Sequence, residues 1–495
     1  MSIEYNLEAQ HKKGKLHAIE RILLLLDKDS FHEIGSGITN YSPEAFKGKK
    51  FPYDGVITGY GTIHGKLVYI YSQDFTVCGG TLGLKHGRKI AHAIELAIKN
   101  KCPIIGINDS GGARIQEAVN ALAGYGDVFY YNTMASGYIP QISIIAGACA
   151  GGAVYSPGIT DFVFVIDNIS KMFVTGPNVV KSVTGQVCTA EELGGAKVHA
   201  TQSGVAHFYH QDEKACLAQV RQLLQLIDKE NIYPVKRESS IKKRFTKIDS
   251  ILPEESRKTY DVKRIIDELL DKNSFLEVQA DFAQNVVVGI GKLGGITVGI
   301  IANQPAFMGG VLDCDSSDKA ARLIRFCDAQ DIPIISLVDV PGFMPGIEQE
   351  HQGIIRHGAK LLYAYAEATV PKLTLVLRKA YGGAYIGMCS KHLKADFVYA
   401  WPDCEIAVMG AEGAVQIIFK SAMRGMEPED KKLFYDQKVA EYNKNMMNAN
   451  MAVEEGYVDE VIQPAETRDR LYHDLLALEH KEELTIHKKH GNIPL

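Results

Sequence analysis

Two glycine pairs in this chain, Gly151-Gly152 and Gly382-Gly383, each follow an apolar run and precede a stretch with helical spacing. The first backbone N–H groups of a helix have no acceptor inside the helix, and they lie at the positive end of its dipole. Such groups can stabilise a negative oxygen as it forms, for example on an enolate. Each pair therefore predicts an oxyanion hole. The alternative is that the glycines only permit close packing of strand and helix.

The chain lacks the side-chain motifs of several common enzyme classes. It has no Gly-x-Ser-x-Gly, no His-Glu-x-x-His and no Gly-x-x-x-x-Gly-Lys-Ser/Thr, which are the usual markers of serine hydrolases, zinc proteases and P-loop enzymes. His357 lies near one of the turns, and we expect it to be structural rather than a base. The nine cysteines never form Cys-x-x-Cys, so we expect reduced core thiols and no metal site.

The glycine pairs belong to a longer internal repeat. Gly59 returns as Gly289 and Gly79-Gly80 returns as Gly309-Gly310, and the same register relates Asp109 to Asp339. The two glycine pairs after these positions differ from that register by one residue. The chain is therefore a duplicated domain, and the repeated glycines indicate a backbone geometry that both copies share.

Apolar runs rich in β-branched residues mark the strands that lead into the turns. These runs are 103–108, 142–146, 333–338 and 373–377. They show no alternation of polar and apolar residues, as expected of strands that are buried on both faces. Residues 87–99 and 318–329 carry apolar residues at helical spacing. Strand, glycine turn and helix in succession predict an α/β fold with a largely parallel sheet in each half.

Length and charge limit the organisation and the partners. The 495 residues fit two domains, which we place at 1–230 and 261–495, with a charged linker at 231–260. The basic cluster from Lys236 to Lys247 is expected to be a solvated part of the linker, and contact with an acidic partner or with phosphates is the alternative. A net charge of −5 gives no reason to expect a nucleic-acid partner. No apolar run approaches the roughly 20 residues of a membrane helix, so we expect a cytoplasmic protein.

Long strings of this sequence resemble one known family. They include GINDSGGARIQE from Gly106, ACAGGAVYSPGITDF from Ala148, the string from Asp313 to Gly346 and YAWPDCEIAVMGAEGA from Tyr399. The strings are similar to the carboxyltransferase subunit of biotin-dependent acyl-CoA carboxylases, in the group of propionyl-CoA carboxylase beta chains and methylmalonyl-CoA decarboxylase alpha chains. The resemblance covers nearly the whole chain.

The resemblance implies an architecture and partners. It implies two tandem crotonase-like (ClpP/crotonase) domains and a homo-hexamer built as a dimer of trimers, with the active site between the N-domain of one protomer and the C-domain of another. It also implies a coenzyme A thioester as substrate, bound mainly on the N-domain. Biotin binds mainly on the C-domain. Because the chain has no Met-Lys-Met sequence, the biotin is expected on a separate carrier protein.

The resemblance also assigns roles to residues. It implies that Gly151 and Gly152 hold the oxygen of the thioester as its α-carbon becomes an enolate. Gly383 and Ala384 would hold the ureido oxygen of biotin. By analogy with crotonases, the further amide candidates on the neighbouring turns are Gly111 and Gly342.

Two side chains are candidates for substrate binding. Arg114 could position a carboxylate or a phosphate through its planar guanidinium, and an ion pair with Glu117 is the alternative. Ile386 stands where many propionyl-type enzymes of the family have an aspartate linked to acyl length, so it is a candidate for the pocket floor, with a core position as the alternative. The family's usual Thr-Ala-Arg-Glu-Arg reads His-Ala-Ile-Glu-Arg from His17. The preferred acyl group is therefore open.

Several functions remain open at the level of sequence. The resemblance allows a carboxylase, with a biotin carboxylase subunit as partner. It also allows the alpha subunit of a sodium-pumping methylmalonyl-CoA decarboxylase, which would meet the membrane through its partner subunits. A non-catalytic acyl-CoA-binding scaffold is a candidate of another class. A biotin-free hydratase or isomerase would need a carboxylate beside the hole, and the two positions after each glycine pair offer none.

Overall fold

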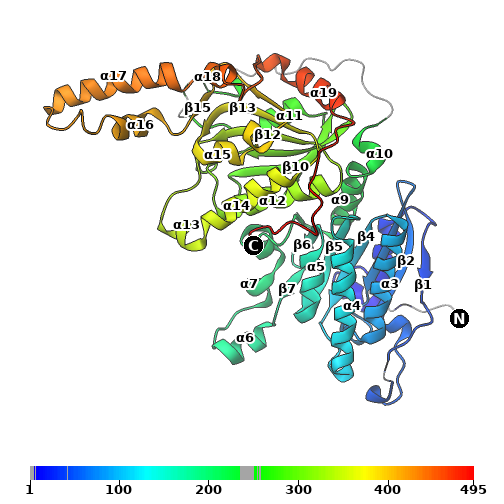
Figure 1. Ribbon diagram of the computed structural model, residues 1–495. Coiled ribbons are helices and arrows are strands. Elements are labelled where there is room, and N and C mark those ends of the chain that lie inside the picture. Colours follow the sequence, from blue (N-terminus) through cyan, green and yellow to red (C-terminus); the bar gives the residue numbers. More distant parts are fainter. Residues whose placement is uncertain (1–4, 6, 42, 235–249, 254, 256–257) are drawn as a thin grey trace. The chain divides into compact units, whose positions relative to one another are not determined.

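The computed structural model describes residues 5, 7–41, 43–234, 250–253, 255 and 258–495. It divides into two compact units, residues 1–225 and 226–495, which run from blue to green and from green to red in Figure 1. At the start of the predicted linker, helix α10 (Lys229–Ile232) packs in the second unit against β11. Residues 235–249, which hold the basic cluster, lie outside the described residues.

The first unit is built on an eight-stranded sheet with the order β1-β2-β3-β4-β5-β6-β8, in which β7 pairs with β5 off this path. The antiparallel pairs are β1 with β2 and β2 with β3, and from β3 to β8 all pairs are parallel. The strands are β1 (His32–Ile34), β2 (Val56–Ile63), β3 (Lys66–Gln73), β4 (Ile104–Ser110), β5 (Gln141–Ala150), β6 (Phe162–Ile166), β7 (Lys171–Phe173) and β8 (Phe208–His210).

The second unit repeats this topology. Its order is β16-β14-β13-β12-β11-β10-β9, with β15 paired to β13, so β12 and β13 correspond to β4 and β5. The strands are β9 (Leu276–Val278), β10 (Val286–Leu293), β11 (Ile296–Asn303), β12 (Ile334–Val340), β13 (Lys372–Tyr381), β14 (Phe397–Ala400), β15 (Glu405–Ala407) and β16 (Glu460–Val461). The predicted α/β class with parallel pairing in each half is confirmed.

Helices connect and cover the strands (Figure 1). In the first unit they are α1 (Leu7–His11), α2 (Ala18–Leu25), α3 (Leu84–Asn100), α4 (Val119–Ala135), α5 (Tyr155–Ile159), α6 (Pro177–Thr184), α7 (Ala190–Gly194), α8 (Ala196–Thr201) and α9 (Glu213–Leu226), the last of which ends at the first residue of the next unit. In the second unit they are α10, α11 (Lys263–Leu269), α12 (Cys314–Ala329), α13 (Ile347–Gln352), α14 (Ile354–Glu367), α15 (Gly382–Gly387), α16 (Ala411–Ile418), α17 (Pro428–Met446), α18 (Ala449–Glu454) and α19 (Thr467–Ala477).

Helices α3 and α12 begin earlier than their apolar spacing predicts, because caps satisfy their first N–H groups. In α12, the side chain of Asp313 accepts from the N–H of Ser316 and completes a capping box. In α3, the residue before the helix is Gly83, which offers no side chain, and the carboxylate of Glu117 accepts from the N–H of Leu84 at 2.8 Å instead. A residue more than thirty positions away thus sets the start of α3.

The central strands bear out the predicted burial. Every residue of β4 and β12 is buried, which agrees with apolar runs that lack alternation. Strand β5 is longer than the predicted 142–146 because its last residues pair with β7. The nine cysteines, all within the described residues, are free thiols, and all are buried except Cys78 and Cys188, which are half-buried. Across the described ranges no helix combines the length and the apolar character needed to cross a membrane.

Candidate active site

Both glycine pairs begin a helical turn directly after a central strand. Strand β5 ends at Ala150 and a 3-10 turn begins at Gly151, while β13 ends at Tyr381 and α15 begins at Gly382. Gly151 and Gly382 have φ values of 62° and 59°, in the left-handed region that favours glycine. This backbone requirement explains the first glycine of each pair.

The second glycine of each pair presents an N–H group without an acceptor. The first residues of a helix have no intrahelical acceptor, and within the described part of the chain no hydrogen bond is donated by the N–H of Gly152, Gly383 or Ala384. A Cβ at Gly152 would meet the ring of Tyr125 at 3.3 Å, whereas a Cβ at Gly383 would have only Phe343, at 4.0 Å. Both turns therefore offer fixed donors to a ligand oxygen.

A further donor lies on the turn after β4, at a residue that sequence reasoning missed. The carbonyl of Gly112 accepts from the N–H of Leu82 at 2.9 Å, and the N–H of Arg114 donates to the carbonyl of Leu82 at 2.9 Å. The N–H of Ala113, between them, has no partner among the described hydrogen bonds. The signal that marks the N–H of Ala113 is structural: it is the isolated β-bridge between Leu82 and Ala113.

The second unit repeats the arrangement at Phe343. The N–H of Leu312 donates to the carbonyl of Gly342 at 3.0 Å, and the N–H of Met344 donates back to Leu312. In the described hydrogen bonds the N–H groups of Gly342 and Phe343 have no acceptor. The side chain of Phe343 lies beside the glycine pair, because the Cβ positions of Gly383 and Gly387 would be 4.0 and 3.4 Å from its ring.

The structure corrects the prediction that the amide of Gly111 is a donor for a ligand. The N–H of Gly111 donates to the carbonyl of Gly79 at 3.0 Å, so it is already occupied inside the unit. The equivalent of Gly342 is Gly112 and not Gly111, because Leu82 and Leu312 bond to these two carbonyls in the same way. The N–H of Gly112 donates to the hydroxyl of Ser110 at 3.2 Å.

The repeated pairs Gly79-Gly80 and Gly309-Gly310 pack against the backbone near the ends of β4 and β12. A Cβ at Gly80 would lie 2.1 Å from the carbonyl oxygen of Asp109, and a Cβ at Gly310 would lie 2.8 Å from that of Asp339. Only glycine allows this approach between two backbones. The repeat therefore preserves contact with the penultimate residue of β4 and of β12.

Arg114 is a buried structural cation. Its guanidinium is 2.5 Å from the carboxylate of Asp54 and 2.9 Å from that of Glu117, and all three side chains are fully buried. It also donates to the carbonyl of Thr81 at 2.8 Å. The predicted alternative, an ion pair with Glu117, is present, and the guanidinium has no surface to offer a substrate. Arg114 thus holds the turn after β4 against the start of α3.

Two other side chains from the sequence prediction lie in the second unit. Ile386, in α15, is 37% exposed, which does not fit the alternative of a core position. His357, in α14, has its Nδ1 2.9 Å from the carboxylate of Asp318, and the ammonium of Lys360 contacts the same carboxylate at 2.9 Å. His357 is therefore part of a polar cluster with α12, as expected of a structural histidine.

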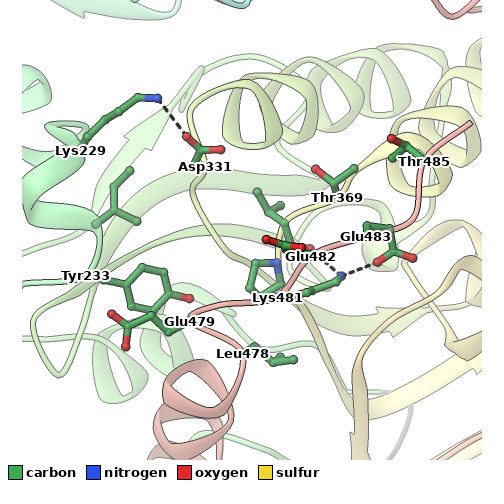
Figure 2. A pocket seen from close by; sticks show the side chains of 13 residues that line it. Lys229, Tyr233, Asp331, Thr369, Leu478, Glu479, Lys481, Glu482, Glu483 and Thr485 are labelled. Carbon is green, nitrogen blue, oxygen red and sulfur yellow. Dashed lines mark hydrogen bonds and ion pairs between the residues drawn. The ribbon is translucent and has the colours of Figure 1, made fainter. Parts of the chain in front are cut away.

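Figure 2 shows a separate cavity, which has a volume of about 640 Å³. It lies at the amino end of β13, the opposite end of that strand from its glycine pair. Residues 369–371, just before β13, line it together with α10 and the segment after α19. Ion pairs join Lys229 to Asp331 at 3.0 Å and Lys481 to Glu483 at 3.1 Å. Neither glycine pair lines this cavity, and neither does the turn after β4 or β12, so the cavity does not belong to the candidate site.

The site thus consists of backbone donors rather than of side-chain acids and bases. Each unit brings the turn after one central strand next to the glycine pair after the neighbouring strand, and both are at the carboxyl edge of a parallel sheet. Donors fixed in this way stabilise an oxygen that becomes negative during a reaction. Fold and site together define a protein of tandem crotonase-like architecture, with backbone N–H donors at the carboxyl edge of each sheet.

Comparison with known proteins identifies the family. The model described as "Carboxyl transferase domain" matches residues 9–493. The methylmalonyl-CoA decarboxylase subunit alpha of Veillonella parvula is 51% identical over 99% of this chain and 96% of that protein. The propionyl-CoA carboxylase beta chain of Roseobacter denitrificans is 50% identical over 99% of this chain and 96% of that protein. The chain belongs to this carboxyl transferase family and is a carboxyltransferase.

A solved structure supports the same conclusion. The structure described as the transcarboxylase 12S hexamer, with methylmalonyl-coenzyme A and methylmalonic acid bound, has a TM-score of 0.95 and 45% sequence identity. The match covers 99% of this chain and 95% of that one. The tandem crotonase-like architecture is therefore confirmed over the whole chain.

Proposed function

We propose that this carboxyltransferase moves a carboxyl group between biotin, carried on a separate protein, and the α-carbon of a short acyl-CoA, with propionyl-CoA and methylmalonyl-CoA as the preferred pair. The observation that carries this proposal is the repeated glycine pair, which gives each unit N–H donors at the end of an equivalent strand that have no acceptor among the described hydrogen bonds. The names of the relatives and the methylmalonyl-coenzyme A bound to transcarboxylase 12S support the acyl group.

In the proposed mechanism the first unit acts on the thioester. The N–H groups of Gly151, Gly152 and Ala113 donate to the thioester oxygen. They stabilise the negative charge on this oxygen as the α-proton leaves and the thioester becomes an enolate. In the second unit, the N–H groups of Gly383, Ala384, Gly342 and Phe343 would hold the ureido oxygen of biotin. Biotin, when bound, supplies the carboxyl group and a base. The turns then need no acid or base of their own.

The direct test is carboxyl transfer from methylmalonyl-CoA or malonyl-CoA to free biotin by the purified chain. We expect formation of labelled carboxybiotin that avidin abolishes, since avidin sequesters biotin. Lack of avidin-sensitive transfer with both thioesters would refute the proposal. It would favour a non-catalytic acyl-CoA-binding scaffold, against which the open N–H groups in both turns now argue.

We also propose the assembly and the partners. A homo-hexamer is supported by the hexamer named for transcarboxylase 12S. The partners are a biotin carrier protein and either a biotin carboxylase subunit or membrane decarboxylase subunits. Sequence identity does not distinguish the carboxylase partners from the decarboxylase partners. This chain is 51% identical both to the Veillonella decarboxylase subunit and to a putative propionyl-CoA carboxylase beta chain of Bacillus subtilis. The cytoplasmic location stays a prediction.

Ile386 is proposed to contact the acyl group. It lies in α15, three residues after Gly383, and is 37% exposed. Replacing Ile386→Asp shortens the side chain and should favour propionyl-CoA over acetyl-CoA by about tenfold in kcat/KM, the usual range for one methylene in a pocket. Ile386→Leu keeps the volume and should leave the ratio within about twofold. An unchanged ratio in Ile386→Asp would remove Ile386 from the acyl pocket.

A further inference from the structure

Both sheets are interrupted at the penultimate residue of the strand that leads into a donor turn. The pairing of β4 with β5 shifts register across Asp109, and the pairing of β12 with β13 shifts across Asp339. Such a bulge breaks the ladder of backbone hydrogen bonds that sets the spacing of two strands. Both aspartates are buried, and they occupy equivalent positions of the duplication. Something other than the ladder must hold the strands at this point.

In the first unit, two cations from the N-terminal segment bind the aspartate. The carboxylate of Asp109 is 2.5 Å from the ammonium of Lys15 and 3.3 Å from the guanidinium of Arg21. The same guanidinium donates to the carbonyl of Ala146 on β5 at 2.8 Å, and it pairs with Glu213 at 2.6 Å. Arg21 therefore joins the end of β4 to β5 across the bulge.

In the second unit, the partner strand itself supplies the contacts. One oxygen of Asp339 accepts from Nε of Arg378 at 3.1 Å, and the other accepts from the N–H of Lys379 at 3.2 Å; both residues lie on β13. The guanidinium of Arg378 also stacks on the ring of Tyr260 at 5.0 Å and donates to the carbonyl of Lys258 at 2.7 Å. Burial raises the pKa of Asp339, and Arg378 opposes that effect.

The difference between the units comes from one position on the strand. Arg378 is four residues before its glycine pair, and the residue four before the other glycine pair is Gly147. A Cβ at Gly147 would lie 1.9 Å from the carboxylate of Asp109 and 2.4 Å from the ammonium of Lys15. The first unit thus has no room for a cation on its own strand, and Lys15 fills that space.

We propose that Asp109 and Asp339 are positioning residues for the two oxyanion holes, and that Lys15 and Arg21 make the N-terminal segment part of the acyl-CoA hole alone. This inference rests on the proposed function of the turns. Each aspartate ties the strand that ends in one donor turn to the strand that ends in the glycine pair. This contact sets the distance between the N–H donors on the two turns. It thereby determines whether both donors can bond to one oxygen.

The test uses the thioester carbonyl as a reporter of the first hole alone. Propionyl-CoA with ¹³C at this carbonyl is bound to the intact enzyme, and its infrared stretch is compared with that in solution. We expect a shift to lower frequency in the wild type. Lys15→Met should lose most of this shift and lower the kcat of transfer by at least about tenfold, part of the 10²–10³ attributed to an oxyanion donor. KM should change by less than about threefold, because the loss falls on the transition state.

Three further variants separate positioning from general stability. Lys15→Arg should restore the carbonyl shift. Arg378→Met, its counterpart in the second unit, should lower kcat but keep the shift. Lys12→Met, whose side chain is 77% exposed, should change neither.

An unchanged shift in Lys15→Met, or its loss in both Lys15→Met and Arg378→Met, would overturn the inference. If Lys15→Met does not assemble, Lys15→Gln, which keeps a donor, takes its place under the same criteria. A wild-type enzyme without avidin-sensitive transfer would instead reject the proposed function.

Discussion

Replacing Gly383→Val is expected to reduce carboxyl transfer by about 10² to 10³ in kcat, the cost of losing one oxyanion donor. The valine side chain would stand over the N–H group and keep the ureido oxygen away from it. The fold should survive, because a Cβ at this position has only the ring of Phe343, at 4.0 Å, and the glycine does not have positive φ. The measurements are transfer to free biotin, thermal unfolding and the size of the assembly.

The matched control for this experiment is Gly126→Val. Gly126 lies within α4, a Cβ there meets no atom within 4 Å, and valine is a better helix former than glycine. This variant should keep both transfer activity and thermal stability. If Gly383→Val also kept its activity while remaining assembled, the second hole would have no part in the mechanism.

Replacing Arg114→Met is expected to destabilise the first unit by about 3 to 5 kcal/mol, the cost of leaving a buried ion pair without one partner. The variant leaves the carboxylates of Asp54 and Glu117 fully buried without their cation. For a unit of this size the loss corresponds to a fall of about 10 °C in the midpoint of thermal unfolding. Calorimetry gives the midpoint, and the KM for methylmalonyl-CoA is measured below the transition.

Arg88→Met provides the comparison, because the side chain of Arg88 is 66% exposed and lies 3.8 Å from Asp127. An exposed pair of this kind contributes at most about 1 kcal/mol, so the midpoint should hardly move. A different pattern in Arg114→Met, with a stable fold and a raised KM, would return Arg114 to the role of a substrate ligand.

The backbone geometry of the turns could be predicted because it restricts which residue types can occupy each position. Positive φ at Gly151 and Gly382, and the close approach of Gly80 to the carbonyl of Asp109, admit only glycine at low cost. The duplication shows these demands twice, which separates them from incidental glycines. Buried parallel strands are visible for a similar reason, since burial on both faces removes polar residues from the run.

The availability of each N–H group could not be predicted. Gly111 and Ala113 are two residues apart on one turn, yet the first donates to Gly79 and the second has no partner in the described hydrogen bonds. The acceptors are about thirty residues away, and which N–H they occupy depends on how that loop lies against the turn. Sequence reasoning therefore chose Gly111 and missed Ala113 and Phe343.

The same limit applies to charges. Arg114 next to Glu117 indicates an ion pair along the chain, but the third member, Asp54, comes from a 3-10 turn sixty residues earlier. Asp109 is visible as a repeated acid, whereas its cations Lys15 and Arg21 lie some ninety residues away. A buried charge needs partners at hydrogen-bond distance, and only the packed chain determines which cations reach it.

The amino-acid sequence by itself determined that the protein is a duplicated α/β carboxyltransferase with a glycine turn after a central strand in each half, because glycine, apolar runs and long matching strings record local backbone and burial requirements. The tertiary structure alone decided which amides remain open and which side chains hold the turns in place. The physical reason is that hydrogen bonds and ion pairs in a buried site are made between segments far apart in the chain, and one residue of shift along a turn changes which N–H faces the ligand.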